Sequence, residues 1–139
     1  YAMERIVYTS RARTDLASDE VFRIIETSAR NNPARDVTGF LIFNQNRFLQ
    51  LVEGERQALD ELLGVLKRDP RHCDLAIHVR EPAIKRCFPN WRMRRLGSAS
   101  ESGAEILHIL AERDIGPQCM QLVGEFLTYS EVVSQKRSA

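Results

Sequence analysis

The chain has 139 residues, of which 43% are hydrophobic and 28% charged, a composition typical of one soluble folded domain. Its 20 basic and 19 acidic residues leave a net charge of +1, so no global electrostatic field favours nucleic acid or a membrane as partner. No apolar run approaches the ~18 residues of a membrane-spanning helix, and the chain does not open on a signal segment. We therefore expect a cytoplasmic protein that binds neither nucleic acid nor membrane.

The cysteines and histidines give no sign of a disulfide framework or a metal site. Cys73, Cys87 and Cys119 are odd in number and widely spaced, which is typical of a protein from a reducing compartment. The three histidines lack the spacing of metal ligands, so we expect no metal. The glycine-rich strings of nucleotide-binding loops and the G-x-S-x-G string of hydrolases are also absent from the sequence.

Hydrophobic patterns in the first 80 residues predict alternating strands and helices. Ser18 is a good N-cap followed by two acids, and Pro33 follows the end of the helical pattern that Ser18 begins. The polar run 44–47 separates two apolar stretches and predicts a hairpin. In chain order we expect a strand over 5–10, a helix over about 18–30, strands over 37–43 and 48–53, a helix over about 55–68 and a strand over 75–80.

The last third of the chain differs in pattern and in charge. We expect a strand over 91–96, a break of small residues over 97–100, and amphipathic helices over about 101–113 and 117–134. Residues 1–97 carry a net charge of +4, whereas residues 98–139 carry −3. We therefore divide the chain into a core domain, 4–97, and a C-terminal helical extension, 98–139.

The element order predicts the fold class. The series βαββαβ is that of an α+β, ferredoxin-like sheet, to which this chain adds one strand and two C-terminal helices. In this topology the first and third strands are neighbours, and the first two helices cover one face of the sheet. Because the apolar sides of the C-terminal helices need a surface to cover, we expect those helices on the opposite face.

Two polar residues are expected to meet beneath the first two helices. Side chains alternate between the faces of a strand, so Tyr8 and Ser10 share one face of the first strand, and Gln50 lies on one face of the third. If both faces look towards the helices, Tyr8 and Gln50 become neighbours. A buried glutamine without a hydrogen bond costs about 1–3 kcal/mol, so we expect a polar partner there.

None of the candidate site residues is a usual acid–base or nucleophilic group. Tyr8, Ser10, Asn32 and Gln50 are hydrogen-bonding residues, and the amides of Asn32 and Gln50 both donate and accept. Such a set suits the carbonyl and N–H edge of a planar heteroaromatic ligand better than it suits hydrolysis.

Five stretches of the sequence follow the order and spacing of a known family. They are Tyr8-Thr-Ser10, Asn32-Pro-Ala-Arg-Asp-Val-Thr-Gly-Phe40, Phe48-Leu-Gln-Leu-Val-Glu-Gly54, Asp69-Pro-Arg-His72 and Phe88-Pro-Asn-Trp-Arg-Met93. Together these stretches, within about residues 4–97, resemble the BLUF family. Members of that family are blue-light photoreceptor domains that bind a flavin, normally FAD.

The resemblance implies photochemical roles for four residues. Tyr8 matches the tyrosine that passes an electron and a proton to the excited flavin, and Gln50 matches the glutamine between that tyrosine and the ring. Charge recombination then leaves Gln50 rotated or tautomerised, which shifts the flavin absorption. Trp91 and Met93, expected on the last strand, match the pair that relays the change.

The resemblance also implies a flavin-binding set that includes Tyr8 and Gln50. Asn32 matches the asparagine that bonds the ring at its O4 and N3 side, and Ser10 matches a nearby serine. Arg71 and His72 match positions near the pyrimidine edge of the flavin. The family implies FAD, with FMN as the alternative, because no residue here distinguishes the two.

The function that the resemblance implies is a blue-light sensor without enzymatic activity. Residues 98–139 are too few for a catalytic output domain, so the signal is expected to pass to a separate signalling protein. Because sheet edges commonly pair in small sensors, we also expect a homo-oligomer, a dimer or higher.

Two alternative functions share the same topology. One is a small-molecule-binding regulatory module without photochemistry. The other is an acylphosphatase-like hydrolase, which needs a phosphate-cradling loop after the first strand. Arg11 and Arg13 are there, but no glycine accompanies them. The colour of the purified protein separates the sensor from both alternatives.

Overall fold

The computed structural model describes residues 2–13, 20, 23, 36–70, 72–97 and 101–128. Glu20 and Arg23 are helical, and both fall inside the helix expected over 18–30. The other residues of that helix lie outside the described part of the chain, as do residues 129–134 of the last expected helix.

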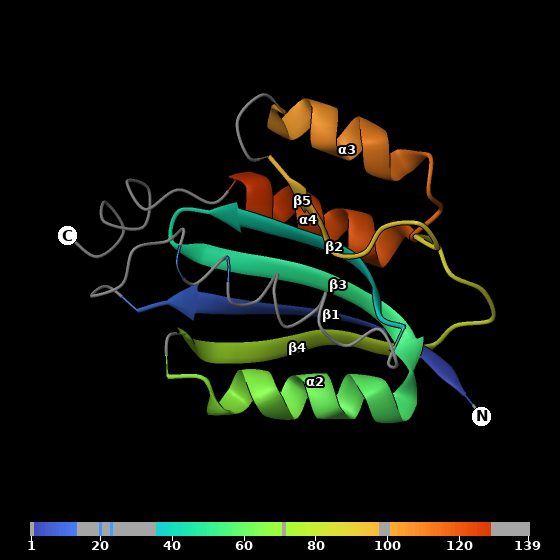
Figure 1. Cartoon of the computed structure of the whole chain (residues 1–139). Helices are drawn as coiled ribbons and strands as arrows, with labels where there is room; N and C mark the ends of the chain where they lie inside the picture. Colours follow the sequence, from blue (N-terminus) through green and yellow to red (C-terminus); the bar gives the residue numbers. More distant parts are fainter. Residues whose placement is uncertain are drawn as a thin grey trace.

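The described elements form one five-stranded sheet with helices on both faces (Figure 1). They are β1 (Met3–Ala12), β2 (Thr38–Asn44), β3 (Arg47–Glu55), α2 (Arg56–Arg68), β4 (His72–Pro82), β5 (Arg94–Leu96), α3 (Gly103–Ala111) and α4 (Pro117–Thr128). The strand order is β4-β1-β3-β2-β5, in which the first four strands are antiparallel and β5 runs parallel to β2. The α+β, ferredoxin-like prediction is confirmed, and β1 and β3 are neighbours as expected.

A two-residue turn joins β2 to β3. Asn44 and Arg47 are the last pair of the β2–β3 ladder, so only Gln45 and Asn46 lie between the strands. Both turn residues have positive φ, 52° and 64°, which is the conformation of the tight turns that match the twist of a hairpin. The predicted hairpin is confirmed; β2 is shifted by one residue from the expected strand, and β3 is longer than expected.

The edge strand β4 pairs with β1 but does not follow it evenly. The register shifts between Val7 and Tyr8 and again between Thr9 and Arg11, so β4 carries two irregularities. Asp74, near the second of them, has a φ of 55°. Extra residues of this kind bend a strand and interrupt its ladder of hydrogen bonds.

The helix α2 closes one core of the molecule. Its predicted apolar stripe is buried, and it packs on side chains from one face of the sheet. The members of this α2-side core include Ile6, Tyr8, Leu41, Phe48, Val52, Leu59, Leu62, Leu63, Leu66 and Met93.

The two C-terminal helices close a second core on the opposite face, as Figure 1 shows. Its members include Val7, Phe40, Leu49, Leu51, Phe88, Trp91, Ile106, Leu110, Val123 and Phe126. The expected packing of the C-terminal helices is therefore confirmed. No helix in the described ranges is long and apolar enough to cross a membrane.

The strand expected over 91–96 is wrong for its first half. Only Arg94–Leu96 pairs as β5, so Trp91 and Met93 lie in the loop before that strand. The backbone oxygen of Trp91 accepts hydrogen bonds from the N–H groups of Gly39 and Met93, both at 2.9 Å. Met93 has a φ of 59°, which is incompatible with an extended strand. The local β propensity of residues 91–93 predicts an extended backbone, but the hydrogen bonds to the Trp91 carbonyl form a turn there instead.

Candidate functional site

Tyr8 and Gln50 lie directly opposite each other in the β1–β3 ladder. Residues that face each other across a ladder project to the same face, so both side chains belong to the α2 side of the sheet. Tyr8 is 2% exposed and Gln50 is 1% exposed. Ser10 follows two positions along the same face and is also buried. The predicted meeting of Tyr8 and Gln50 is confirmed.

Three polar atoms of this group are buried without a hydrogen-bond partner in the part of the chain that the structure describes. They are Tyr8 Oη, Ser10 Oγ and Gln50 Oε1. Each buried polar group left in this state costs about 1–3 kcal/mol, so three together on one face are a strong demand for a polar ligand. A flavin ring, with carbonyl oxygens and ring nitrogens along one edge, fits this demand. We therefore regard these residues as the candidate site.

Burial determines the protonation state of Tyr8. The fully buried phenol has its pKa raised well above the ordinary value, because the ionised form would lose its hydration. Tyr8 is thus a neutral phenol at physiological pH, with a proton on Oη to donate.

Met93 joins the site from the loop before β5. Its sulfur accepts a hydrogen bond from Gln50 Nε2 at 2.8 Å, and its side chain is 3% exposed. The thioether is a weak acceptor, so it orients the amide without binding it tightly. Gln50 therefore has its N–H group directed at Met93 and its oxygen left for a ligand.

Trp91, expected beside Met93, lies on the other side of the sheet. It belongs to the core under α3 and α4, and its ring centroid is 4.8 Å from that of Phe88. The guanidinium groups of Arg94 and Arg113 each lie 4.6 Å from the Trp91 ring centroid. Arg113 follows α3, so Trp91 contacts the C-terminal helical region rather than Gln50.

The remaining expected site residues are less fully described. Asn32 and Arg71 lie outside the described residues, and His72 is placed as the first residue of β4 by its backbone alone. Sequence reasoning missed Glu53, which is fully buried on β3. The sequence does carry a sign of this burial. Alternation places Glu53 on the same strand face as Leu49 and Leu51, which is a buried face.

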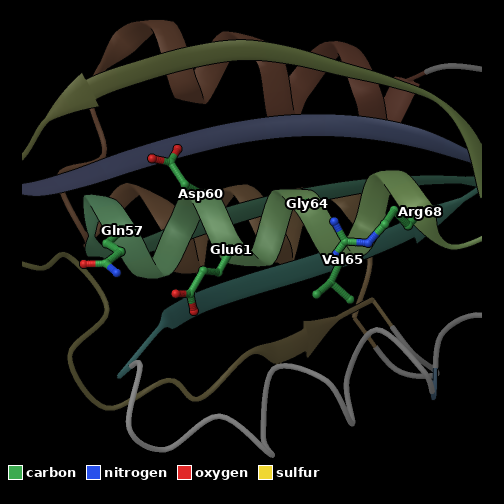
Figure 2. Close-up of a pocket in the computed structure, with 6 residues that line it drawn as sticks. All are labelled: Gln57, Asp60, Glu61, Gly64, Val65 and Arg68. Carbon is green, nitrogen blue, oxygen red and sulfur yellow. The ribbon is translucent and has the colours of Figure 1, made fainter.

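A separate surface hollow of about 450 Å³ lies on the outer side of α2. Figure 2 shows the residues that line it, all from that helix: Gln57, Asp60, Glu61, Gly64, Val65 and Arg68. Asp60 is paired with Arg80 at 2.6 Å, and none of the lining residues belongs to the candidate site. Among the described residues, no group of His, Cys, Asp and Glu could hold a metal ion.

Comparison with known proteins also indicates that this chain binds a flavin. A family model described as BLUF, sensors of blue-light using FAD, matches residues 3–94. The description is of a sensor that uses FAD, so the expected cofactor and the expectation of a domain without catalytic activity are confirmed. The match favours the sensor over the regulatory module and the hydrolase.

Two curated relatives share this region. The blue light- and temperature-regulated antirepressor BluF of Escherichia coli (strain K12) is 31% identical over 70 residues, which are 50% of this chain and 17% of that protein. The photoactivated adenylate cyclase subunit beta of Euglena longa is 29% identical over 84 residues, 60% of this chain and 10% of that protein. The match therefore spans less than a fifth of the length of each relative.

Two solved structures share the fold. BlrB, a BLUF protein in its dark state, is 28% identical, with coverage of 91% of this chain and 98% of that one and a TM-score of 0.65. Klebsiella pneumoniae BlrP1 with FMN and cyclic diGMP is 24% identical, with coverage of 90% of this chain and 34% of that one and a TM-score of 0.76.

Proposed function

Since this chain belongs to the BLUF family, sensors of blue light that use FAD, we propose that light acts on it through Tyr8 and Gln50. The observation that supports this proposal is the facing pair itself. Two buried side chains meet across the central ladder, and each has a polar atom without a partner among the described residues. A ligand that hydrogen-bonds to both Tyr8 Oη and Gln50 Oε1 is therefore in direct contact with both residues.

The roles of the two residues follow from their chemistry. A flavin bound on this face supplies the absorption of blue light and the oxidising power of its excited ring. Tyr8, whose raised pKa keeps the proton on Oη, would pass an electron and that proton to the excited ring and recover both on charge recombination. The Gln50 amide has a donor on one side and an acceptor on the other. Rotation or tautomerisation of this amide therefore changes its hydrogen bonds. Its contact with Met93 Sδ is the bond that changes on the protein side.

The same proposal assigns the flavin-binding set and the division of the chain. Tyr8, Gln50 and Ser10 bind the ring from the sheet, and Asn32, Arg71 and His72 complete the set from residues that the family pattern matches. Residues 4–97 form the sensor domain, and residues 98–139 form its helical extension. Either FAD or FMN satisfies the ring contacts, and FAD is the cofactor of the family.

The output is proposed to be a change in association with a separate signalling protein. The packing of α3 and α4 under the loop that carries Trp91 and Met93 supports a route from the site to the C-terminal helices. BluF is an antirepressor, which is one example of a family member that acts on another protein. We further propose that the chain works as a homo-oligomer, a dimer or higher.

The test is spectroscopic. Purified protein is expected to be yellow, to release about one flavin per chain on denaturation, and to show a reversible red shift of the flavin absorption under blue light. A colourless protein that also fails to take up added FAD or FMN contradicts the proposal. Flavin that binds but shows no reversible shift contradicts the photochemical part alone.

A further inference from the structure

Glu53 is a fully buried carboxylate that the proposed photochemistry does not use. It lies on β3, three residues after Gln50, and its side chain is on the α3–α4 side of the sheet. Its Oε2 accepts the N–H of Cys87 at 2.8 Å, and its Oε1 accepts the N–H groups of Cys87 and Phe88, both at 3.1 Å. The guanidinium of Arg5 lies 3.5 Å from the same carboxylate. A buried charge is stable in this form because it is paired and hydrogen-bonded.

A second contact fixes the same segment to the same residue. Arg86 donates one hydrogen bond to the backbone oxygen of Glu53 at 2.9 Å and another to Thr38 Oγ1 at 2.7 Å. The side chain and the backbone of Glu53 therefore together hold residues 86–88 against β3 and β2. This is the first part of the loop that leads to the site.

The fixed segment determines where Met93 lies. Phe88 is completely buried, and its ring packs against those of Phe40 and Trp91. The Trp91 backbone oxygen then accepts the N–H groups of Gly39 and Met93. Met93, with its φ of 59°, directs its sulfur at Gln50 Nε2. A non-glycine residue keeps such a φ only where its surroundings hold it there.

We propose that Glu53 is a positioning residue of the light response: its buried carboxylate fixes the loop of residues 86–93 so that the Met93 sulfur meets the Gln50 amide. The inference rests on the proposed role of Gln50. In the described orientation the amide N–H group faces the sulfur. A rotated amide would direct its oxygen at the sulfur, which places one acceptor against another. The proposal takes this described orientation as that of the dark state. A fixed Met93 therefore favours the dark state, and a loosened loop lengthens the life of the lit state.

The principal experiment compares Glu53→Gln with Glu81→Gln in the full chain with its flavin. Glu53→Gln keeps the size of the side chain but replaces one accepting oxygen with an NH₂ group, which cannot accept from the loop. Glu81 also pairs with Arg5, at 3.3 Å, and is the matched control for the loss of one charge beside that arginine. We expect Glu53→Gln to retain flavin and to lengthen the lit-state lifetime by about 3- to 10-fold, as the loss of one or two net hydrogen bonds predicts. The control is expected to keep the wild-type lifetime.

A second readout does not depend on the flavin. In the dark, the hydrogen-bonded amides of Cys87, Phe88, Trp91 and Met93 are expected to exchange with solvent at least about tenfold faster in Glu53→Gln than in Glu81→Gln, because their hydrogen bonds open more often. A third readout tests whether Glu53 acts on the lit-state lifetime through Met93. In a Met93→Leu background, Glu53→Gln is expected to change the lifetime by less than about twofold, since residues that act through one contact are not additive.

The outcomes separate this inference from the proposed function. If Gln50→Leu loses the light-induced shift while Glu53→Gln matches its control in lifetime and exchange, Glu53 is not a positioning residue. Full additivity with Met93→Leu likewise overturns the inference. If Gln50→Leu keeps the shift, the proposed function fails instead. Should Glu53→Gln not bind flavin, Arg86→Met removes the second contact from the same loop, and an unchanged lifetime and exchange in that variant overturn the inference.

Discussion

The two faces of the sheet differ in how far their buried polar groups have hydrogen-bond or ionic partners. On the α2 side, Tyr8, Ser10 and Gln50 each keep a buried polar atom without a partner among the described residues. On the α3–α4 side, the carboxylate of Glu53 accepts from two backbone N–H groups and pairs with Arg5. Among the described residues of the α3–α4 side, Arg5 Nε is also buried without a partner, but the other nitrogens of that guanidinium are bonded to Glu81, Lys85 and Cys87. We call the α3–α4 side the complete face, because each of these charged side chains is paired. We call the α2 side the incomplete face, because Tyr8 Oη and Ser10 Oγ have no partner there in the described part of the chain. A face that binds nothing would not retain three such groups at this cost.

The largest expected effect comes from Gln50→Leu, which acts on the incomplete face. The substitution keeps the bulk of the side chain and removes its donor and acceptor, so we expect bound flavin without any light-induced red shift. Absorption spectra before and after blue light measure this. Gln57→Leu, at an exposed position of α2, is the control and should shift normally. A normal, reversible shift in Gln50→Leu would exclude this residue as the switch.

Tyr8→Phe is expected to have the next largest effect. It removes only the hydroxyl, so the protein should keep its flavin and fold but lose the normal photocycle, because the phenol's electron and proton are gone. Flash spectroscopy measures the loss. Thr9→Val removes a hydroxyl from the next position, which points to the opposite face, and should leave the photocycle intact. An unchanged photocycle in Tyr8→Phe would move the donor elsewhere, with Trp91 the next candidate.

Phe126→Ala tests the complete face, where we expect a loss of stability without a loss of signal. Phe126 is 4% exposed in the core under α4, so its truncation should lower the free energy of unfolding by about 3–5 kcal/mol. Denaturant unfolding measures the stability, and the size of the light-induced shift in the folded fraction should equal that of wild type. A loss below about 1 kcal/mol would mean that α4 adds little to this core.

The smallest expected effect on stability comes from Arg113→Gln. The Arg113 guanidinium lies over the rings of Trp91 and Phe88, and such contacts contribute about 0.5–1 kcal/mol near a surface. We expect that modest loss, together with weaker light-induced changes of amide exchange in α3 and α4. Arg92→Gln, at an exposed position of the loop before β5, next to Trp91, is the control.

Exchange that is identical in dark and light throughout residues 91–128 of wild type, with a normal spectral shift, would contradict a route through Arg113. The C-terminal helices would then serve only as a cover for the sheet. Position between two sites does not by itself demonstrate coupling, so this measurement decides the matter.

The sequence was sufficient for the central contact of the site. Alternation along each strand and the βαββαβ order predict Tyr8 and Gln50 as neighbours if both faces look towards the helices, and the structure adds that they are directly opposite in register. The apolar stripe of α2 and the packing of the C-terminal helices follow from helical periodicity in the same way.

The loop before β5 could not be predicted in this manner. Trp91 and Met93 have local preferences for a strand, but the positive φ of Met93 depends on hydrogen bonds to the Trp91 carbonyl from residues on two separate segments. Glu53 was missed because an acid near the end of a strand is usually solvated, whereas here the donors that bury it come from residues 87 and 88.

The uneven pairing of β4 also affects how the protein behaves at high concentration. A straight edge strand offers a continuous row of peptide groups to which another chain can add. The two register shifts in β4 and the left-handed backbone of Asp74 break that row into short pieces. Addition of another chain to this edge, and aggregation that begins there, are therefore disfavoured.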